Sequence, residues 1–219
     1  MKSLHKGENG MRTLVWFRGK DLRISDHEPL LSAIQEGECI PVFVLDPYFF
    51  SPERAAELPH RMQFLLDGLH ALAKNIEHKG SELICVEGKS IDVIPELART
   101  FKVDRVVAHR WVEPFGQKRD QIIKDALKVP FELFEGEMLH TPGSLRTGKG
   151  TPFGVFTPFS KKFRSTVTIR PSLAAPKKNP TSPETPEGQA SSDSNSEQTQ
   201  DSGESKHPAG RRKSRERAS

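Results

Sequence analysis

The sequence predicts an α/β protein: a doubly wound, five-stranded parallel sheet with helices on both faces, a Rossmann-like arrangement. From residue 11 onward, short apolar runs alternate with longer stretches that have the periodicity of helices. The runs are apolar at consecutive positions, which is typical of strands covered on both faces of a sheet. Strands that alternate with helices are joined by right-handed crossovers, and such crossovers produce a parallel sheet.

Five apolar runs are the predicted strands, and two of them end at residues that stop a strand. Asp46-Pro47 follows the second run, and proline cannot donate a hydrogen bond to a neighbouring strand. Glu87-Gly88 closes the third run. The five runs are residues 13–17, 40–45, 83–86, 105–108 and 131–134.

Three stretches between these runs have an apolar face, as expected for helices that cover a sheet. Ser90 is placed to cap the second of them, whose apolar residues lie between Val93 and Phe101. A third apolar group lies at residues 122–127, and Gly80 is a stop signal for the first helix. The apolar face of that first helix consists of Leu65, Leu69, Leu72 and Ile76.

The chain has four predicted parts. These are a flexible N-terminus at residues 1–10, the α/β domain at 11–140, an extended connector at 141–175 and a disordered polar tail at 176–219. Gly, Pro and Thr dominate the beginning of the connector. In the tail, Ala190 is the only apolar residue between Lys177 and Pro208, so burial cannot offset the entropy of ordering the backbone.

Composition and charge restrict the partners and the compartment. The formal net charge of +4 is too small and too dispersed to indicate DNA binding by itself. The basic cluster at residues 211–217 suits weak or indirect contact with DNA, and a solvated tail is the alternative. Cys39 and Cys85 lack the spacing of metal ligands, so we expect two reduced, buried thiols. No stretch is apolar enough for a membrane span or a signal peptide, so we expect a cytoplasmic protein without membrane contact.

The loops that follow the predicted strands are the expected binding edge, because ligands of such sheets bind at the carboxyl ends of the strands. These loops are residues 18–23, 46–50, 88–90 and 109–116. Arg18, Lys20 and Arg23 either hold a phosphate or carboxylate ligand, or form a salt network inside the domain. The sequence contains no arrangement typical of independent catalysis or of a metal site, so no catalytic residue and no metal ligand is predicted.

Several phrases of the sequence resemble the amino-terminal α/β domain of the photolyase/cryptochrome family. Residues 17–27 read FRGKDLRISDH, similar to the family phrase FRRDLRxxDN, with one extra residue and with His27 where Asn is usual. Residues 112–120, VEPFGQKRD, resemble its EPY…RD signature, and residues 155–159, VFTPF, resemble the closing phrase of the domain. The resemblance covers about residues 11–165.

The resemblance implies an antenna domain that holds a folate, deazaflavin or flavin chromophore at the carboxyl edge of the sheet. The residues expected nearest this pocket are Arg18, Asp46, Arg61, Phe64 and Glu113. Glu113 either accepts hydrogen bonds from a ring ligand or pairs with Arg119 and caps the following helix. Phe64 is expected in the core rather than as a stacking surface. Gly88-Lys89 stands where many members have Gly-Asp, which brings a cation to the pocket edge.

Three functions follow from the resemblance. In the family, a helical domain carries FAD and repairs pyrimidine dimers in DNA under light, and the sequence after the connector does not resemble that domain. The chain is therefore expected to be an antenna domain that does not bind FAD for repair and is inactive as a photolyase on its own. One alternative is one chain of a split photolyase, completed by a separate FAD-binding polypeptide. The other is a non-catalytic regulatory protein of the same fold.

Overall fold

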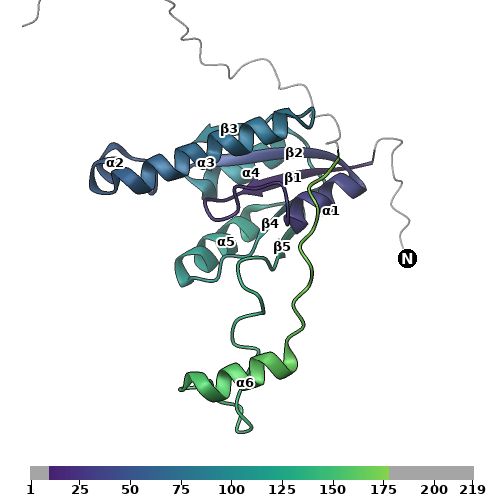
Figure 1. The fold of residues 1–219 in the computed structure, drawn as a ribbon. Helices are drawn as coiled ribbons and strands as arrows, with labels where there is room; N and C mark the ends of the chain where they lie inside the picture. The colour runs from purple at the N-terminus through teal and green to yellow at the C-terminus, as the bar shows by residue number, and fades with distance from the viewer. Residues whose placement is uncertain (1–9, 178–219) are drawn as a thin grey trace, which may run out of the picture. The chain divides into compact units, whose positions relative to one another are not determined.

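The computed structural model describes residues 10–177 and contains the predicted five-stranded, all-parallel sheet (Figure 1). The strand order is β3-β2-β1-β4-β5, and the fold class predicted from the sequence is confirmed. The predicted N-terminal segment, except Gly10, and nearly all of the predicted tail lie outside the described residues. The strands are β1 (Met11–Phe17), β2 (Gly37–Leu45), β3 (Ile84–Glu87), β4 (Arg105–His109) and β5 (Phe131–Phe134).

Both faces of the sheet are buried, which explains why the strands are apolar at consecutive positions. Along β1, Leu14 and Trp16 belong to one core cluster, whereas Val15 and Phe17 belong to the other. Successive side chains of a strand point to opposite faces, so each face receives every second residue. Each of these four side chains is at most 3% exposed.

Helices cover the two faces and place the loops at one edge of the sheet. The first core cluster includes residues of α4 and α5, such as Ile94 and Ile123. The second includes residues of α1 and α3, such as Leu30 and Leu72. The helices are α1 (Glu28–Glu36), α2 (Pro52–Glu57), α3 (Pro59–Glu77), α4 (Ser90–Thr100), α5 (Pro114–Ala126) and α6 (Phe156–Thr166).

The strand order reverses between β1 and β4, and this position determines where a site can form. From β1 the chain builds outward through β2 to β3, and then returns to the other side of β1 to add β4 and β5. The loops after β1 and β4 therefore leave in opposite directions and open a crevice at the carboxyl edge. No helix in the described part of the chain is long and apolar enough to cross a membrane.

The sequence predictions need correction at four points of the fold, the first of which is a helix that they did not include. The helix α1 was not predicted, because its N-cap is His27, which is an unusual capping residue. The Nδ1 atom of His27 accepts a hydrogen bond from the Leu30 N–H. Ser90 is the first residue of α4 and provides no side-chain cap. Cys85 is exposed because it lies on the edge strand β3, although both cysteines are free and Cys39 is buried, as expected.

The connector is the fourth correction, because a helix interrupts its extended course. The Gly- and Pro-rich composition of residues 141–154 ends before α6, which has Pro158 in its first turn and neither Gly nor Pro in the rest of its length. After α6 the chain is again without regular structure. Leu173 then exchanges two hydrogen bonds with Asp26, whose backbone amide donates at 2.8 Å and whose carboxylate accepts at 3.1 Å.

Candidate functional site

A cavity of about 270 Å³ lies at the carboxyl edge of the sheet, and we call it the aromatic cavity. It receives residues from all four loops predicted to form the binding edge, since Ser90 of the predicted loop 88–90 is among them, and also from α3. Its walls include two residues of α3 that the sequence placed at the pocket. The lining residues are Trp16, Phe17, Arg18, Gly19, Lys20, Phe43, Val44, Asp46, Phe49, Phe50, Arg61, Phe64, Leu65, Ser90, Trp111 and Arg119.

Aromatic rings from two loops stack on each other beside this cavity. Phe49, after β2, stacks on Trp111, after β4, with 6.2 Å between ring centroids and 19° between planes. Tyr48 and Phe115 form a second stacked pair at 4.8 Å and 20°. Such rings present flat apolar surfaces to which another planar ring can add. The cavity is therefore suited to a planar aromatic ligand.

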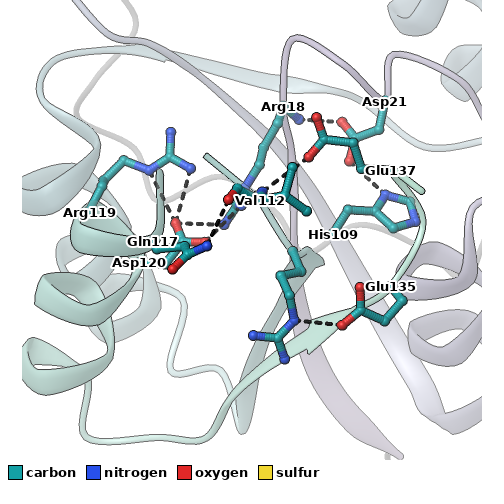
Figure 2. Close-up of polar contacts among 10 residues, drawn as sticks. Arg18, Asp21, His109, Val112, Gln117, Arg119, Asp120, Glu135 and Glu137 are labelled. Atoms are coloured by element: carbon teal, nitrogen blue, oxygen red, sulfur yellow. Dashed lines mark hydrogen bonds and ion pairs between the residues drawn. The ribbon is translucent and has the colours of Figure 1, made fainter. Parts of the chain in front are cut away.

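A buried ion pair joins the end of β1 to α5 behind the cavity. Both terminal nitrogens of Arg18 donate to the Asp120 carboxylate, at 3.0 and 3.1 Å, and the two side chains are 4% and 5% exposed (Figure 2). Arg119 donates to the same carboxylate at 3.0 Å. Burial lowers the pKa of Arg18 to about 10, although Asp120 acts in the opposite direction. Two guanidinium groups thus share one carboxylate, and Arg18 belongs to a salt network inside the domain, the predicted alternative to ligand binding.

Two tryptophans pack against these cations. The Arg18 guanidinium lies 4.2 Å from the centre of the Trp16 ring, and the Arg119 guanidinium lies 4.7 Å from the rings of both Trp16 and Trp111. Gly116 allows this packing, since a Cβ atom there would come within 2.4 Å of Trp111. The cation–π contacts fix the tryptophan rings that line the cavity.

Asp46 lines the cavity, and its carboxylate is engaged by the protein. One oxygen accepts hydrogen bonds from the Ser90 amide at 2.9 Å and from the Ser90 hydroxyl at 2.7 Å. The other oxygen accepts from the Tyr48 amide at 3.1 Å. Asp46 therefore caps α4 from the neighbouring loop, which explains why Ser90 itself does not.

Arg61 and Phe64 lie at the mouth of the cavity on the exposed side of α3. The expectation that Phe64 belongs to the core is wrong, because its side chain is 77% exposed. The buried face of α3 contains Leu69, Leu72 and Ile76, and Phe64 is off this face. Arg61 forms no ion pair with any residue that the structure describes.

Glu113 does not line the aromatic cavity, and its partner within the protein is not Arg119. Its carboxylate accepts a hydrogen bond from Lys20, which also donates to Glu137 and lies 4.9 Å above the Trp111 ring. The pairing of Glu113 with Arg119 is therefore wrong, and Glu113 forms no side-chain cap for α5. The bond from Lys20 holds the pKa of Glu113 below its usual value. Partial burial lowers the pKa of Lys20, but its two carboxylate partners raise it overall.

Three buried side chains could be mistaken for a metal site: Asp21, His27 and His109, whose ligand atoms lie within 4.8 Å of one another. His109 Nδ1 lies 2.8 Å from Asp21 Oδ2, and His27 Nε2 lies 3.5 Å from the same oxygen. Because His27 Nδ1 accepts the capping hydrogen bond of α1, the ring proton must sit on Nε2, the nitrogen that a metal would need. We therefore interpret this group as support for the loop after β1.

The sequence interpretation missed Arg119 and Asp120 as parts of the site. The buried residues of α5 are Gly116, Arg119, Asp120 and Ile123, which follow helical spacing. Charged residues in such a stripe are almost never fully buried unless they are paired. The helical spacing of these residues was the signal for a buried charge that the sequence contained, but it does not identify Arg18 as the partner of Asp120.

Comparisons with known proteins agree with this geometry. The family model described as DNA photolyase matches residues 13–183. A deoxyribodipyrimidine photo-lyase of Thermus thermophilus is 33% identical over 171 residues, which are 78% of this chain and 37% of the relative. The crystal structure of a class III photolyase from Agrobacterium tumefaciens has a TM-score of 0.71 and 29% identity, covering 84% of this chain and 38% of the other.

An archaeal structure is also similar. An archaeal photolyase from Sulfolobus tokodaii, whose structure with two FAD molecules is described as implying a novel light-harvesting cofactor, has a TM-score of 0.59 and 26% identity. The match covers 78% of this chain and 38% of that protein. The chain thus spans somewhat more than a third of the length of each of these three relatives.

Replacement of Asp120 by Asn should strongly destabilise the protein, because Arg18 and Arg119 would lose their shared anion in a buried position. Loss of one partner from a buried ion pair costs about 3–5 kcal/mol. Urea unfolding would measure this change. Asp125→Asn on the exposed side of α5 is the matched control and should change the unfolding free energy by less than about 0.5 kcal/mol. Equal stability of the two variants would contradict the role of the pair.

Protonation of His27 should weaken the fold in mild acid. Burial lowers the pKa of folded His27 below its usual value of 6.5, despite the neighbouring Asp21, so the unfolded chain takes up the proton first. Stability should therefore fall as the pH drops below about 6.5, by at most about 1.4 kcal/mol per pH unit from this one group. Unfolding by urea at pH 7.5 to 5.5 would measure the slope.

The variant His27→Asn tests this assignment, since Asn keeps a capping oxygen and does not titrate. Its stability should vary less with pH than that of the natural chain. His70→Asn, at an exposed position of α3, should leave the slope unchanged. The same slope in all three proteins would show that His27 is not the responsible group.

Proposed function

Because the chain belongs to the DNA photolyase family, we propose that its α/β body binds a light-absorbing antenna chromophore in the aromatic cavity. One observation supports this above all: the cavity lies at the carboxyl edge of the sheet and has stacked aromatic rings in its wall. Folates, deazaflavins and flavins, the chromophores that the family resemblance implies, all contain planar rings suited to such a wall.

Different side chains of the cavity would contact the ring and hold the surrounding loops in place. Phe49 and Trp111 offer the stacking surface, and Phe64 adds an exposed ring at the mouth. Asp46 fixes the loop that carries Phe49, and the pair between Arg18 and Asp120 fixes the strand end beneath. The bound chromophore would absorb light and pass the energy to a flavin elsewhere. The protein residues orient it and exclude water.

For light-driven repair of pyrimidine dimers in DNA, we propose that this α/β domain acts together with a flavin-binding helical part. The chain matches only 37% of the Thermus photo-lyase. By the family resemblance, a flavin-binding helical part performs the repair. We propose that the chain alone does not repair dimers and that its own contribution is light capture.

The native protein should carry a chromophore that absorbs in the near ultraviolet or visible range. Phe64→Ala should weaken chromophore binding about two- to twelvefold and so lower the ratio of chromophore to protein, because one stacking ring is worth about 0.5–1.5 kcal/mol. Leu66→Ala, a partly exposed residue of the same helix outside the cavity, should leave the ratio unchanged. Absorption spectra and mass identification of the extracted ligand provide the measurement. A natural chain without chromophore that also takes up no folate, deazaflavin or flavin would contradict the proposal.

A second candidate function is one chain of a two-chain photolyase, and the exposed apolar surface of α6 favours it. No residue of α6 is buried, and Val155 and Phe156 are 65% and 75% exposed. The helix also contains Lys161, Lys162 and Arg164 and no acidic residue. This surface suits an acidic, partly apolar partner, for which we propose a separate flavin-binding helical polypeptide.

Reconstitution would test this second candidate. The chain would be mixed with the helical part of the Agrobacterium photolyase, and dimer repair under light would be measured. Repair should require both polypeptides and should be lost in Phe156→Asp. Ile122→Asp, at an exposed apolar position of α5, should not affect it. Repair by the 219-residue chain alone, or equal effects of the two variants, would contradict this candidate.

A further inference from the structure

After α6 the chain returns to the α/β domain as a segment without regular structure, and we call residues 167–176 the strap. The strap is bound to the beginning of α1 at two places. Leu173 exchanges its two hydrogen bonds with Asp26, the residue before the N-cap. The Arg170 guanidinium lies 3.4 Å from the Glu28 carboxylate in the first turn. The strap is therefore held by the start of α1.

Few other interactions keep the strap in place. Pro176 is its only buried residue, and the Arg170 side chain is 74% exposed. An ion pair in such an exposed position contributes little to stability. Segments with little buried apolar surface and with exposed backbone hydrogen bonds open locally while the rest of a protein stays folded. The strap should therefore open more easily than the sheet.

A cavity of about 440 Å³ is lined on one side by the strap, between Thr168 and Leu173, and on the other by residues 135–141 after β5. Opening of the strap would expose this lining to solvent. It would also release the carboxyl end of α6, because the strap begins directly after that helix. The position of the strap thus affects two parts of the surface.

His27 lies beside Asp26 in the chain, and its ring cannot take a second proton without losing a contact. Its Nδ1 accepts the Leu30 N–H at 3.1 Å, so a proton on Nδ1 would place one donor against another. A positive charge is also unfavourable at the N-terminus of a helix. The ring is fully buried against Phe17 and His109, with centroid distances of 4.6 and 4.4 Å. Each of these conditions favours the neutral ring.

The charged groups near His27 do not reverse this preference. Asp21 favours the charged ring, but its carboxylate lies 3.5 Å from His27 Nε2 and already accepts from His109 at 2.8 Å. Burial therefore lowers the pKa of His27 below its usual value, despite Asp21. The charged or titratable side chains that face the ring or lie next to it are Asp21, Arg23, Glu28, His109 and Arg170.

We propose that the strap is a pH-sensitive device, which opens in mild acid when His27 takes up a proton. Since Asp26 and His27 are consecutive, the charged ring cannot leave the end of α1 without turning the Asp26 peptide to which the strap is bonded. Once exposed to water, the ring regains its ordinary affinity for protons, so a fall in pH favours the open state. This device is independent of the chromophore in the proposed function.

Amide hydrogen exchange of the full 219-residue chain, measured by NMR between pH 7.5 and 5.5, would test the device. After correction for intrinsic exchange, the amides of Asp26, Leu30 and Leu173 should share one opening equilibrium. This equilibrium should rise about three- to tenfold over the range, since one proton changes it at most tenfold per pH unit. It should exceed the opening equilibrium of the β1 amides at least about a hundredfold, because the strap opens locally.

Histidine variants identify the responsible group. His27→Asn keeps a capping oxygen and does not titrate, so the rise should disappear. His109→Gln and His140→Asn remove the two histidines that line the cavity under the strap, and both should retain the rise. A rise that is lost in either of these variants but kept in His27→Asn would overturn the inference.

A pair of variants at Asp26 tests the attachment of the strap. Asp26→Ala removes the carboxylate that accepts from the Leu173 amide, and the opening equilibrium should rise about two- to twelvefold at every pH. Asp26→Asn keeps an acceptor oxygen and should behave like the natural chain. Equal effects of the two variants would contradict the role of this hydrogen bond.

The natural chain decides the outcome even if a variant does not fold. An opening equilibrium at Leu173 equal to that of β1 would show that the strap opens only on global unfolding, which overturns the device. A rise at Leu30 without one at Leu173, or no rise at either, also overturns it. A shared local rise that His27→Asn removes supports it. None of these results bears on chromophore binding, so failure here leaves the proposed function intact.

Discussion

The contact between Arg18 and Asp120 holds together the part of the molecule on which the site depends. It joins the end of β1 to α5 across the position where the strand order reverses, and both side chains are almost fully buried. An unpaired charge in such surroundings would strongly destabilise the folded state, so each side chain needs the other as its partner. Arg119 shares the same carboxylate, and the three side chains form the base on which Trp16 and Trp111 rest. The crevice at the sheet edge therefore has a rigid floor.

In the crevice above this floor, aromatic rings can recognise the shape of a ligand, and unpaired cations can recognise its charge. Above it, stacked rings provide a flat surface, while most cations of the crevice are already neutralised by protein carboxylates. Arg61 at the mouth is the exception among the described residues that line the aromatic cavity. A flat ring can therefore be held by contact area, and the remaining charges can select among substituents.

The sequence was sufficient to predict the sheet, because the central strands β1, β2 and β4 are buried on both faces and are apolar at most consecutive positions. The binding edge was also predictable, since parallel strands end at one edge of the sheet. Side-chain partners were not: Asp120 lies 102 residues from Arg18, and nothing local distinguishes it from other carboxylates. Phe64 was misplaced because a shift of one position along a helix turns a side chain by about 100°. The helix α6 was missed because Gly and Pro dominate the beginning of its segment.

The cations beside the two tryptophans have a consequence for photochemistry. Removal of an electron from an indole leaves a positive ring, and guanidinium groups within about 5 Å of the ring centres oppose that charge. One carboxylate between two guanidinium groups leaves an excess positive charge nearby. Trp16, against which both guanidinium groups pack, would therefore be a poor electron donor to a light-excited ligand bound in the crevice.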